Sequence, residues 1–302
     1  MLSSTYIKEA ALIAGFNLCG VTSSDDFDTE RAHFGEWLSA GMGDALPYMH
    51  QYLDVRFNPA NIMEGCKTAV VCAVNYKNNF SISQCDSPLP KIASYALNED
   101  YHRSIRRALK SLLRSLQSHY PTLNGRCCVD TAPLLEKHLA QRAGLGWIGR
   151  QSLLVTPQYG SFVLLGVLLL DDDVDIVDEQ YKGVGCGTCR RCIEICPNSA
   201  INDNRTIDSR LCISAQTVEC EHTQEPLNGW VFGCDECQSC CPYNKKSPLA
   251  TSQMMTPIYI PPSREQWQGL TDEDFINIFN KTPLKRAGLA RIKEKVGQNF
   301  DE

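Results

Sequence analysis

Apolar and polar residues alternate along the chain with periods that predict strands and helices in turn. Residues 1–65 have helical patterns interrupted by glycine and proline, whereas the β-branched run 68–76 predicts a central strand. Between residues 102 and 116, apolar side chains recur every three or four positions. This period predicts an amphipathic helix whose other face is basic.

Further strands and a helix are expected downstream. A short strand at 127–129 precedes a helix over 132–144, and two strands at 152–156 and 161–170 are expected to pair across a turn at Gly160. Because strands and helices alternate, the sequence predicts a layered α/β or α+β domain.

Changes in composition divide the chain into three parts. We expect a layered domain over 1–175, a cysteine-rich module over 176–248 and a mostly helical tail over 249–302. No apolar run reaches the ~18 residues that a membrane-spanning helix needs, and the N-terminus lacks the pattern of a signal peptide. A cytoplasmic protein with no membrane partner is therefore expected.

The distribution of charge and cysteine suggests the chemistry. The net charge of −6 argues against general binding to polyanions. The basic helix face formed by Arg103, Arg107, Lys110 and Arg114 could nevertheless contact a phosphate backbone or simply be solvated. Of 16 cysteines, ten lie in residues 186–241. Since disulfides are rare in the cytoplasm, these ten are better explained as metal ligands.

The first four crowded cysteines have a ferredoxin spacing. They are Cys186, Cys189, Cys192 and Cys196, followed by Pro197. This C-x2-C-x2-C-x3-C-P motif is typical of bacterial two-cluster ferredoxins, in which the fourth cysteine binds the other cubane. A structural zinc site is the alternative, but zinc sites do not require the triple spacing or the C-P ending.

A second group repeats the motif with one ligand displaced. It comprises Cys234, Cys237 and Cys241, and Cys212 or Cys240 can supply the eighth ligand. By the crossover rule, one [4Fe–4S] cluster takes Cys186, Cys189, Cys192 and Cys241, and the other takes Cys196, Cys212, Cys234 and Cys237. Cys240 could replace Cys212, because it also forms C-x2-C-x2-C with Cys234 and Cys237.

Four segments together resemble one family. They are YALNEDYH at 95–102, VDTAPLLEKHLAQRAGLGWIG at 129–149, GSFVLLG at 160–166 and GCDECQSCCPYN at 233–244. They are similar to the signature of the epoxyqueuosine reductases, cobalamin-dependent enzymes of tRNA modification. The chain departs from that signature at Arg150, where the family usually has lysine, and in SAQTVE at 214–219, where an aromatic residue is usual.

The resemblance implies an α+β protein with a nitroreductase-like, cobalamin-binding α/β domain, a two-[4Fe–4S] ferredoxin-like domain and a short helical tail. It also implies reduction of epoxyqueuosine to queuosine at the wobble position of tRNA. Electrons would pass from an external low-potential donor through the two clusters to cobalamin, and the protein is expected to be a monomer.

The resemblance further implies roles for individual residues. Asp130 is expected to donate the proton, which at neutral pH requires a raised pKa; its alternative role is to cap a helix beginning at Pro133. Residues expected to bind cobalamin are Arg56, Tyr101, His102, Arg150, Ser152, Leu154, Gly160, Ser161 and Leu165. The resemblance also implies tRNA contacts at Ser214, Gln216 and Glu219, and the basic helix face, independently of the resemblance, adds Arg103, Arg107 and Lys110 as expected tRNA contacts.

Two other functions stay open on the sequence. A corrinoid-dependent reductase or reactivating protein would share the clusters and cobalamin but would not bind tRNA. An electron-transfer ferredoxin would bind no corrin, although the large domain before the cysteines argues against it.

Overall fold

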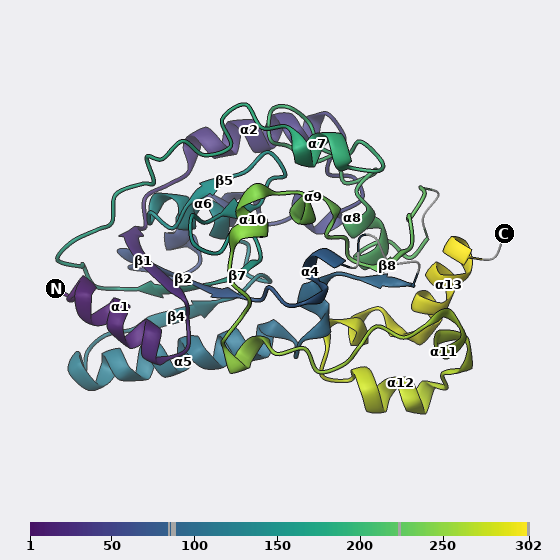
Figure 1. The fold of residues 1–302 in the computed structure, drawn as a ribbon. Helices are drawn as coiled ribbons and strands as arrows, with labels where there is room; N and C mark the ends of the chain where they lie inside the picture. Colours follow the sequence, from purple (N-terminus) through teal and green to yellow (C-terminus); the bar gives the residue numbers. More distant parts are fainter. Residues whose placement is uncertain (84, 86–88, 223–224, 301–302) are drawn as a thin grey trace.

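The computed structural model describes residues 1–83, 85, 89–222 and 225–300 (Figure 1). The strands are β1 (Leu18–Ser23), β2 (Thr68–Asn75), β3 (Lys91–Ile92), β4 (Gly125–Cys128), β5 (Trp147–Ile148), β6 (Leu154–Val155), β7 (Val163–Leu170) and β8 (Trp230–Phe232). The α-helices are α1 (Ser4–Ile13), α2 (Asp28–Ser39), α3 (Leu53–Arg56), α4 (Phe80–Ser83), α5 (Tyr101–His119), α6 (Glu136–Arg142), α7 (Arg191–Ile195), α8 (Ile213–Val218), α9 (Glu236–Ser239), α10 (Pro242–Lys246), α11 (Arg264–Gly269), α12 (Asp272–Phe279) and α13 (Gly288–Phe300). The 3-10 turns are η1 (Pro47–His50), η2 (Pro59–Asn61), η4 (Ser94–Leu97), η5 (Gln253–Met255) and η6 (Pro283–Arg286).

An antiparallel sheet in the order β1-β2-β7-β4 forms the centre of the N-terminal half. The predicted central strand is confirmed, since every residue of β2 is buried. The predicted pairing of 152–156 with 161–170 is wrong, because β6 pairs with β5 and only Thr156 bridges to Gly160. The long apolar run of β7 instead takes a neighbour on each side, β2 and β4. Such continuous runs suit strands buried on both faces.

Helices cover both faces of this sheet (Figure 1). On one face, α1 and α5 pack their apolar sides against β2 and β7, and Ile105 and Leu109 are fully buried there. On the other face, α6 places Leu139 and Ala140 against the sheet. The amphipathic helix predicted from residues 102–116 is confirmed as α5, and its arginines and Lys110 point to solvent.

Strand β1 was not expected, because residues 1–65 were assigned to helical segments. It is a short edge strand whose register pairs Gly20 with Val71. A Cβ atom added at Gly20 would lie 2.2 Å from the carbonyl oxygen of Ala143. Glycine therefore allows the loop after α6 to approach the edge strand.

Replacing Gly20 with alanine should lower the free energy of unfolding by roughly 1–3 kcal/mol, because the backbone of Ala143 cannot easily move away. Gly35, in helix α2, is the matched control, since no atom lies within 4 Å of its added Cβ. Gly35→Ala should raise the free energy of unfolding by about 0.5–1 kcal/mol. Urea unfolding of both variants tests this expectation, and shifts in the same direction would contradict it.

A second core lies beneath the C-terminal helices. Strand β3 pairs in parallel with β8, and Ile92 and Phe232 pack there against Trp267 and Phe279. One core thus joins residues from all three segments expected to be separate domains, so the boundaries at 175 and 248 stay a prediction. Within the described ranges, no helix is long and apolar enough to cross a bilayer.

Candidate functional site

Four of the expected cluster ligands gather around α7 and the start of α10. Cys192 lies on α7, and Cys241 immediately precedes the first residue of α10. Burial, and after it the thiols of Cys186, Cys189 and Cys241, raise the pKa of Cys192 to about 11. The residues that the crossover rule assigns to one cluster are therefore neighbours in space.

The other expected ligands form a second, adjoining group. Burial, followed by the nearby thiols of Cys234 and Cys212, raises the pKa of Cys237, and Cys192 and Cys196 contribute less. Cys212 in turn lies close enough to Cys196 for that thiol to raise its pKa, after the larger effect of burial. The influence of Cys192 on Cys237 indicates that the two groups lie side by side.

Cys240 lies beside the first group rather than in the second. Burial and then the thiols of Cys192 and Cys241 raise its pKa to about 12, and its Sγ donates to the carbonyl oxygen of Cys237 at 3.5 Å. This position favours Cys212 over Cys240 as the fourth member of the second group. In the described part of the chain, no three His, Cys, Asp or Glu side chains are arranged to hold a single metal ion.

Hydrogen-bond donors point at one sulfur in each group. The indole Nε1 of Trp147 donates to the Sγ of Cys186 at 3.3 Å, and the backbone N–H of Ala200 donates to the Sγ of Cys196 at the same distance. Donors of this kind stabilise cluster thiolates and tune the cluster potential. The donor set and its surroundings therefore fit iron–sulfur clusters.

Asp130 lies at the end of a hydrogen-bonded chain of three side chains. It follows β4 with a left-handed φ of 51°. Its Oδ2 lies 3.1 Å from Nε2 of His102, whose Nδ1 lies 2.7 Å from Oδ1 of Asp100. The ring of Tyr101 stacks on the imidazole with 4.2 Å between centroids.

The pKa shifts of Asp130 and His102 place the proton on the imidazole, whereas a carboxylic acid donor would carry it on Asp130. Burial raises the pKa of Asp130, but the hydrogen bond and charge of His102 outweigh it, and the net direction is downward. Hydrogen bonds to Asp100 and Asp130 raise the pKa of His102 to about 9. The expected raised pKa at Asp130 is therefore not found, and the pair is an aspartate facing an imidazolium.

The alternative role of Asp130 as a helix cap is wrong. Helix α6 begins at Glu136 rather than Pro133, with Leu135 at its N-cap position. The backbone N–H of Asp130 donates to Oε1 of Glu136 at 2.9 Å, which leaves the Asp130 carboxylate pointing elsewhere. Burial, and then the charge of Asp130, raise the pKa of Glu136 to about 8.

The turn η4 connects the second thiol group with Asp130. Asp235, next to Cys234, accepts hydrogen bonds from the backbone N–H and hydroxyl of Ser94 at 2.7 and 2.6 Å. The neighbouring Tyr95 packs edge-on against Tyr101, at 6.0 Å between ring centroids. A Tyr101 hydrogen bond then helps to lower the pKa of Asp130.

Among the described residues, three buried nitrogen donors, two in expected cobalamin residues and one in the neighbouring Gln151, have no hydrogen-bond partner. They are Nε of Arg56, Nε of Arg150 and Nε2 of Gln151. Arg56 is 9% exposed, lies 5.6 Å over the ring of Phe34 and has its pKa lowered by burial. Buried donors without acceptors are costly, so they suit a ligand rich in amide and phosphate oxygens, as cobalamin is.

Other expected cobalamin residues hold the two halves of the protein together. The N–H of Ser161 donates to Oδ1 of Asn244 at 2.6 Å, and a Cβ added at Gly160 would lie 2.0 Å from that oxygen. Leu154 and Leu165 pack in the sheet core. The Ser152 carbonyl accepts from Nζ of Lys137 at 2.6 Å, which orders the loop before β6.

The expected tRNA residues are divided between surface and interior. Arg103, Arg107 and Lys110 are exposed, and among the described residues none of them forms an ion pair. Gln216 is 6% exposed and donates to the Arg210 carbonyl at 2.8 Å, which favours a structural role.

Sequence reasoning did not identify the cationic residue Arg286. Its guanidinium, in η6 of the tail, pairs with Glu219 at the C-terminal end of α8, whereas Ser214 lies at the N-terminal end of that helix. The charge of Arg286 adds to the larger effects of His102 in lowering the pKa of Asp130, and it opposes the burial that raises the pKa of Tyr48 to about 12. No local motif marks Arg286, because only the tertiary packing of the tail brings it here.

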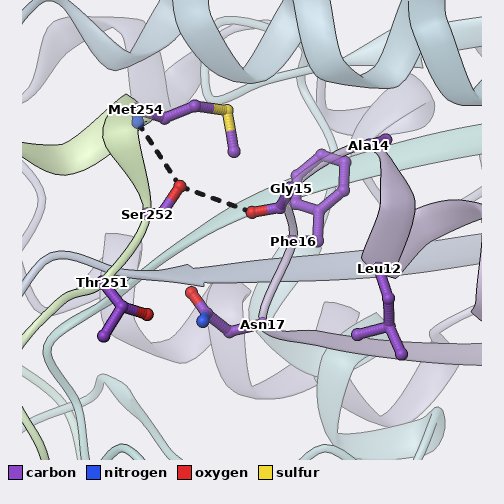
Figure 2. A pocket seen from close by; sticks show the side chains of 8 residues that line it. All are labelled: Leu12, Ala14, Gly15, Phe16, Asn17, Thr251, Ser252 and Met254. Atoms are coloured by element: carbon purple, nitrogen blue, oxygen red, sulfur yellow. Dashed lines mark hydrogen bonds between the residues drawn. The ribbon is translucent and has the colours of Figure 1, made fainter.

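A separate surface hollow lies between the end of α1 and the segment before η5 (Figure 2). It is lined by Leu12, Ala14, Gly15, Phe16, Asn17, Thr251, Ser252 and Met254. The Ser252 hydroxyl donates to the Gly15 carbonyl across it. None of these side chains is ionisable, so the hollow is not the candidate site.

Comparison with known families identifies two matching regions. The family described as "Epoxyqueuosine reductase QueG, DUF1730" matches residues 56–131, and "4Fe-4S double cluster binding domain" matches residues 185–244. The chain is 34% identical to the epoxyqueuosine reductase of Cyclobacterium marinum, over 93% of this chain and 91% of that one. It is also 34% identical to the Escherichia coli epoxyqueuosine reductase, over 94% of this chain and 77% of that one.

Solved structures share the fold. The epoxyqueuosine reductase of Streptococcus thermophilus superimposes with a TM-score of 0.86 and 26% identity, over 98% of this chain and 80% of that one. An epoxyqueuosine reductase bound to an epoxyqueuosine-modified tyrosine tRNA stem loop superimposes with a TM-score of 0.82 and 23% identity, over the same shares of the two chains.

Proposed function

The chain belongs to the epoxyqueuosine reductase family, and from this premise we propose how its residues carry out the reaction. The protein is an oxidoreductase of tRNA modification that reduces epoxyqueuosine to queuosine, with electrons supplied through a 4Fe-4S double-cluster domain. We assign residues 1–175 to a nitroreductase-like domain that holds cobalamin near Asp130. The enzyme would act in the cytoplasm as a monomer, with an external low-potential electron donor.

The observation that carries this proposal is the connection through η4. Ser94 contacts Asp235 beside the second thiol group, and Tyr95 contacts Tyr101 beside Asp130. A cluster held by the second group would thus lie near the acid that serves the substrate. We assign Cys186, Cys189, Cys192 and Cys241 to the first cluster, and Cys196, Cys212, Cys234 and Cys237 to the second.

Cobalamin would occupy the region of the unpartnered donors. Arg56, Gln151 and the Nε of Arg150 would bind its amide and phosphate oxygens, while the Nη atoms of Arg150 stay with Asp203 and the Gly187 carbonyl; β6 and the start of β7 would support the cofactor. When bound, cobalamin supplies a strongly reducing centre that the protein side chains lack. The protein's own contribution is to orient the nucleoside, exclude water and deliver protons at the Asp130 carboxylate.

The reaction fixes the number of protons that the site must deliver. An epoxide, two electrons and two protons give an alkene and one water molecule. The oxygen is therefore protonated twice as its two C–O bonds break. We assign this protonation to Asp130, whose side chain is 56% exposed and therefore accessible to a substrate.

The test is anaerobic reconstitution with iron, sulfide and cobalamin, followed by incubation with epoxyqueuosine-containing tRNA and a chemical reductant. We expect about eight irons per chain, queuosine in the digested tRNA, and no product when cobalamin is left out. The Co(II) EPR spectrum should show no nitrogen splitting from an imidazole ligand. Product formation without cobalamin would contradict the cofactor assignment, and no product under any condition would contradict the function.

Removing three charges from the exposed face of α5 should weaken tRNA binding. In the Arg103→Ala/Arg107→Ala/Lys110→Ala variant, the slope of log K against log salt should fall by about one unit for each lost phosphate contact. A variant lacking Lys67 and Lys182, two exposed cations on other surfaces, is the control. If both variants show the same salt dependence, the basic face of α5 does not contact the tRNA backbone and is simply solvated.

A further inference from the structure

We infer that the imidazolium of His102 supplies the protons for the reaction and that Asp130 transfers them to the substrate. Asp100 positions the His102 ring. This inference rests on the proposed function and assigns the source of the protons that the reaction consumes. It replaces the expectation of a neutral Asp130 carboxylic acid in the resting enzyme.

The geometry around the imidazole requires two donors. Nδ1 lies 2.7 Å from Asp100 and Nε2 lies 3.1 Å from Asp130, so each ring nitrogen faces a carboxylate oxygen. A neutral imidazole has one N–H and one lone pair, and the lone pair would point at an anion. With both carboxylates ionised, as the lowered pKa values of Asp100 and Asp130 indicate, the imidazolium satisfies both contacts with two charge-assisted hydrogen bonds.

The backbone fixes this arrangement from both ends. Asp100 is the N-cap of α5, and its Oδ1 also accepts the backbone N–H of His102 at 3.0 Å. Asp130 is held in its left-handed conformation while its own N–H donates to Glu136. The backbone N–H of Asp100 donates to the carbonyl of Lys281 at 2.7 Å, so the C-terminal tail helps to hold Asp100 in place.

The groups near His102 differ in sign, and the anions dominate. Those that act on it or on its direct partners are Asp100, Asp130, Glu136, Tyr95, Tyr101, Arg103 and Arg286. At pH 7 Glu136, with its pKa of about 8, and both tyrosines are mostly neutral, so the negative charge lies on Asp100 and Asp130. The N-terminus of α5 disfavours a cation, and partial burial does too. Two directly bonded carboxylates outweigh both effects, which agrees with a His102 pKa of about 9.

The proton transfers balance with the reaction. Nε2 of His102 gives its proton to Oδ2 of Asp130, which passes it to the epoxide oxygen as the first C–O bond breaks. His102, 27% exposed, regains a proton from solvent, and the same transfer protonates the departing hydroxyl group. Two electrons from the clusters and these two protons convert the epoxide to an alkene and water.

The first test compares pH–rate profiles of reconstituted His102→Gln and wild-type enzyme. Wild-type turnover should stay flat from pH 6 to pH 8 and fall as the pH rises through about 9, because the imidazolium then loses its proton. Glutamine fills a similar space and stores no proton, so Asp130 must be protonated directly from solvent. Turnover at pH 8 should drop by about 10²-fold or more and recover about tenfold for each unit of lower pH.

His222→Gln is the matched control, because His222 also pairs with a carboxylate, that of Glu294 at 3.0 Å, on an exposed surface. Its profile should match the wild type. An equal loss for His102→Gln at every pH would indicate a structural role and overturn the inference, as would full turnover at pH 8. Absence of queuosine with the wild-type enzyme would instead contradict the proposed function.

The second test needs no turnover. NMR titration of ¹⁵N-histidine-labelled, reconstituted protein should show one imidazole with a pKa near 9 that is missing in His102→Gln. Asp100→Asn keeps the helix cap and a hydrogen-bond acceptor but removes the charge, so the pKa should move toward the ordinary value for histidine. A His102 pKa near 6.5 in the wild type would overturn the inference.

Discussion

Replacing Asp130 with asparagine should lower the turnover of epoxyqueuosine by about 10²–10⁴-fold, the range that general acid catalysis contributes. Asparagine has nearly the same size as aspartate and tolerates the left-handed φ of 51° at this position. It can still accept a hydrogen bond from His102. It cannot pass a proton from the imidazole to the substrate, so the loss should fall on the chemical step.

Iron content, cobalamin spectra and tRNA affinity of the Asp130→Asn protein should stay at wild-type values. Asp173→Asn, a change at an exposed carboxylate paired with Lys67, serves as the control and should retain full turnover. Near-normal turnover by a correctly loaded Asp130→Asn enzyme would remove Asp130 from the proton path.

Replacing Cys212 with alanine should remove one cluster, which lowers the iron content from about eight to about four per chain and abolishes turnover. Cys212 lies with Cys196, Cys234 and Cys237, the group connected to Asp130 through η4. Loss of that cluster would interrupt the electron supply nearest to the substrate.

Cys240→Ala is the matched control for the cluster prediction. Cys240 is also a partly buried cysteine of the module, but its thiol lies beside the first group. We expect it to keep both clusters and most of its activity. The opposite result, with iron lost on changing Cys240 and kept on changing Cys212, would reverse the ligand assignment.

Periodic and closely spaced features were predictable from the sequence. Helix α5 was evident because Ile105, Leu109 and Leu112 recur on one face over about two turns of helix. The buried strand β2 was evident because its apolar run is long. The assignment of cysteines to two clusters by the crossover rule stays a prediction, but the cysteine-rich module itself was evident because ligand spacing within a ferredoxin motif constrains the backbone locally.

Features that depend on distant parts of the chain were not predictable. Edge strand β1 is short and has a glycine where α6 approaches it, so its pattern is weak. The predicted pairing of residues 152–156 with 161–170 was wrong because β7 pairs along both edges with the longer strands β2 and β4, which leaves β6 to pair with β5. Arg286 reaches the site only through the tail, and the low pKa of Asp130 depends on His102 being beside it.

The parallel pairing of β3 with β8 has a consequence for biosynthesis. Residues 91–92 leave the ribosome long before residues 230–232, so the core that contains Ile92 and Phe279 closes only after residue 279 has been translated. Contacts of such high sequence separation form slowly. Cys234 and Cys237 immediately follow β8, so iron insertion must wait for the same event. A nascent or truncated chain would therefore expose Ile92 and the other apolar residues of this core, which makes it a client for chaperones before it can receive its clusters.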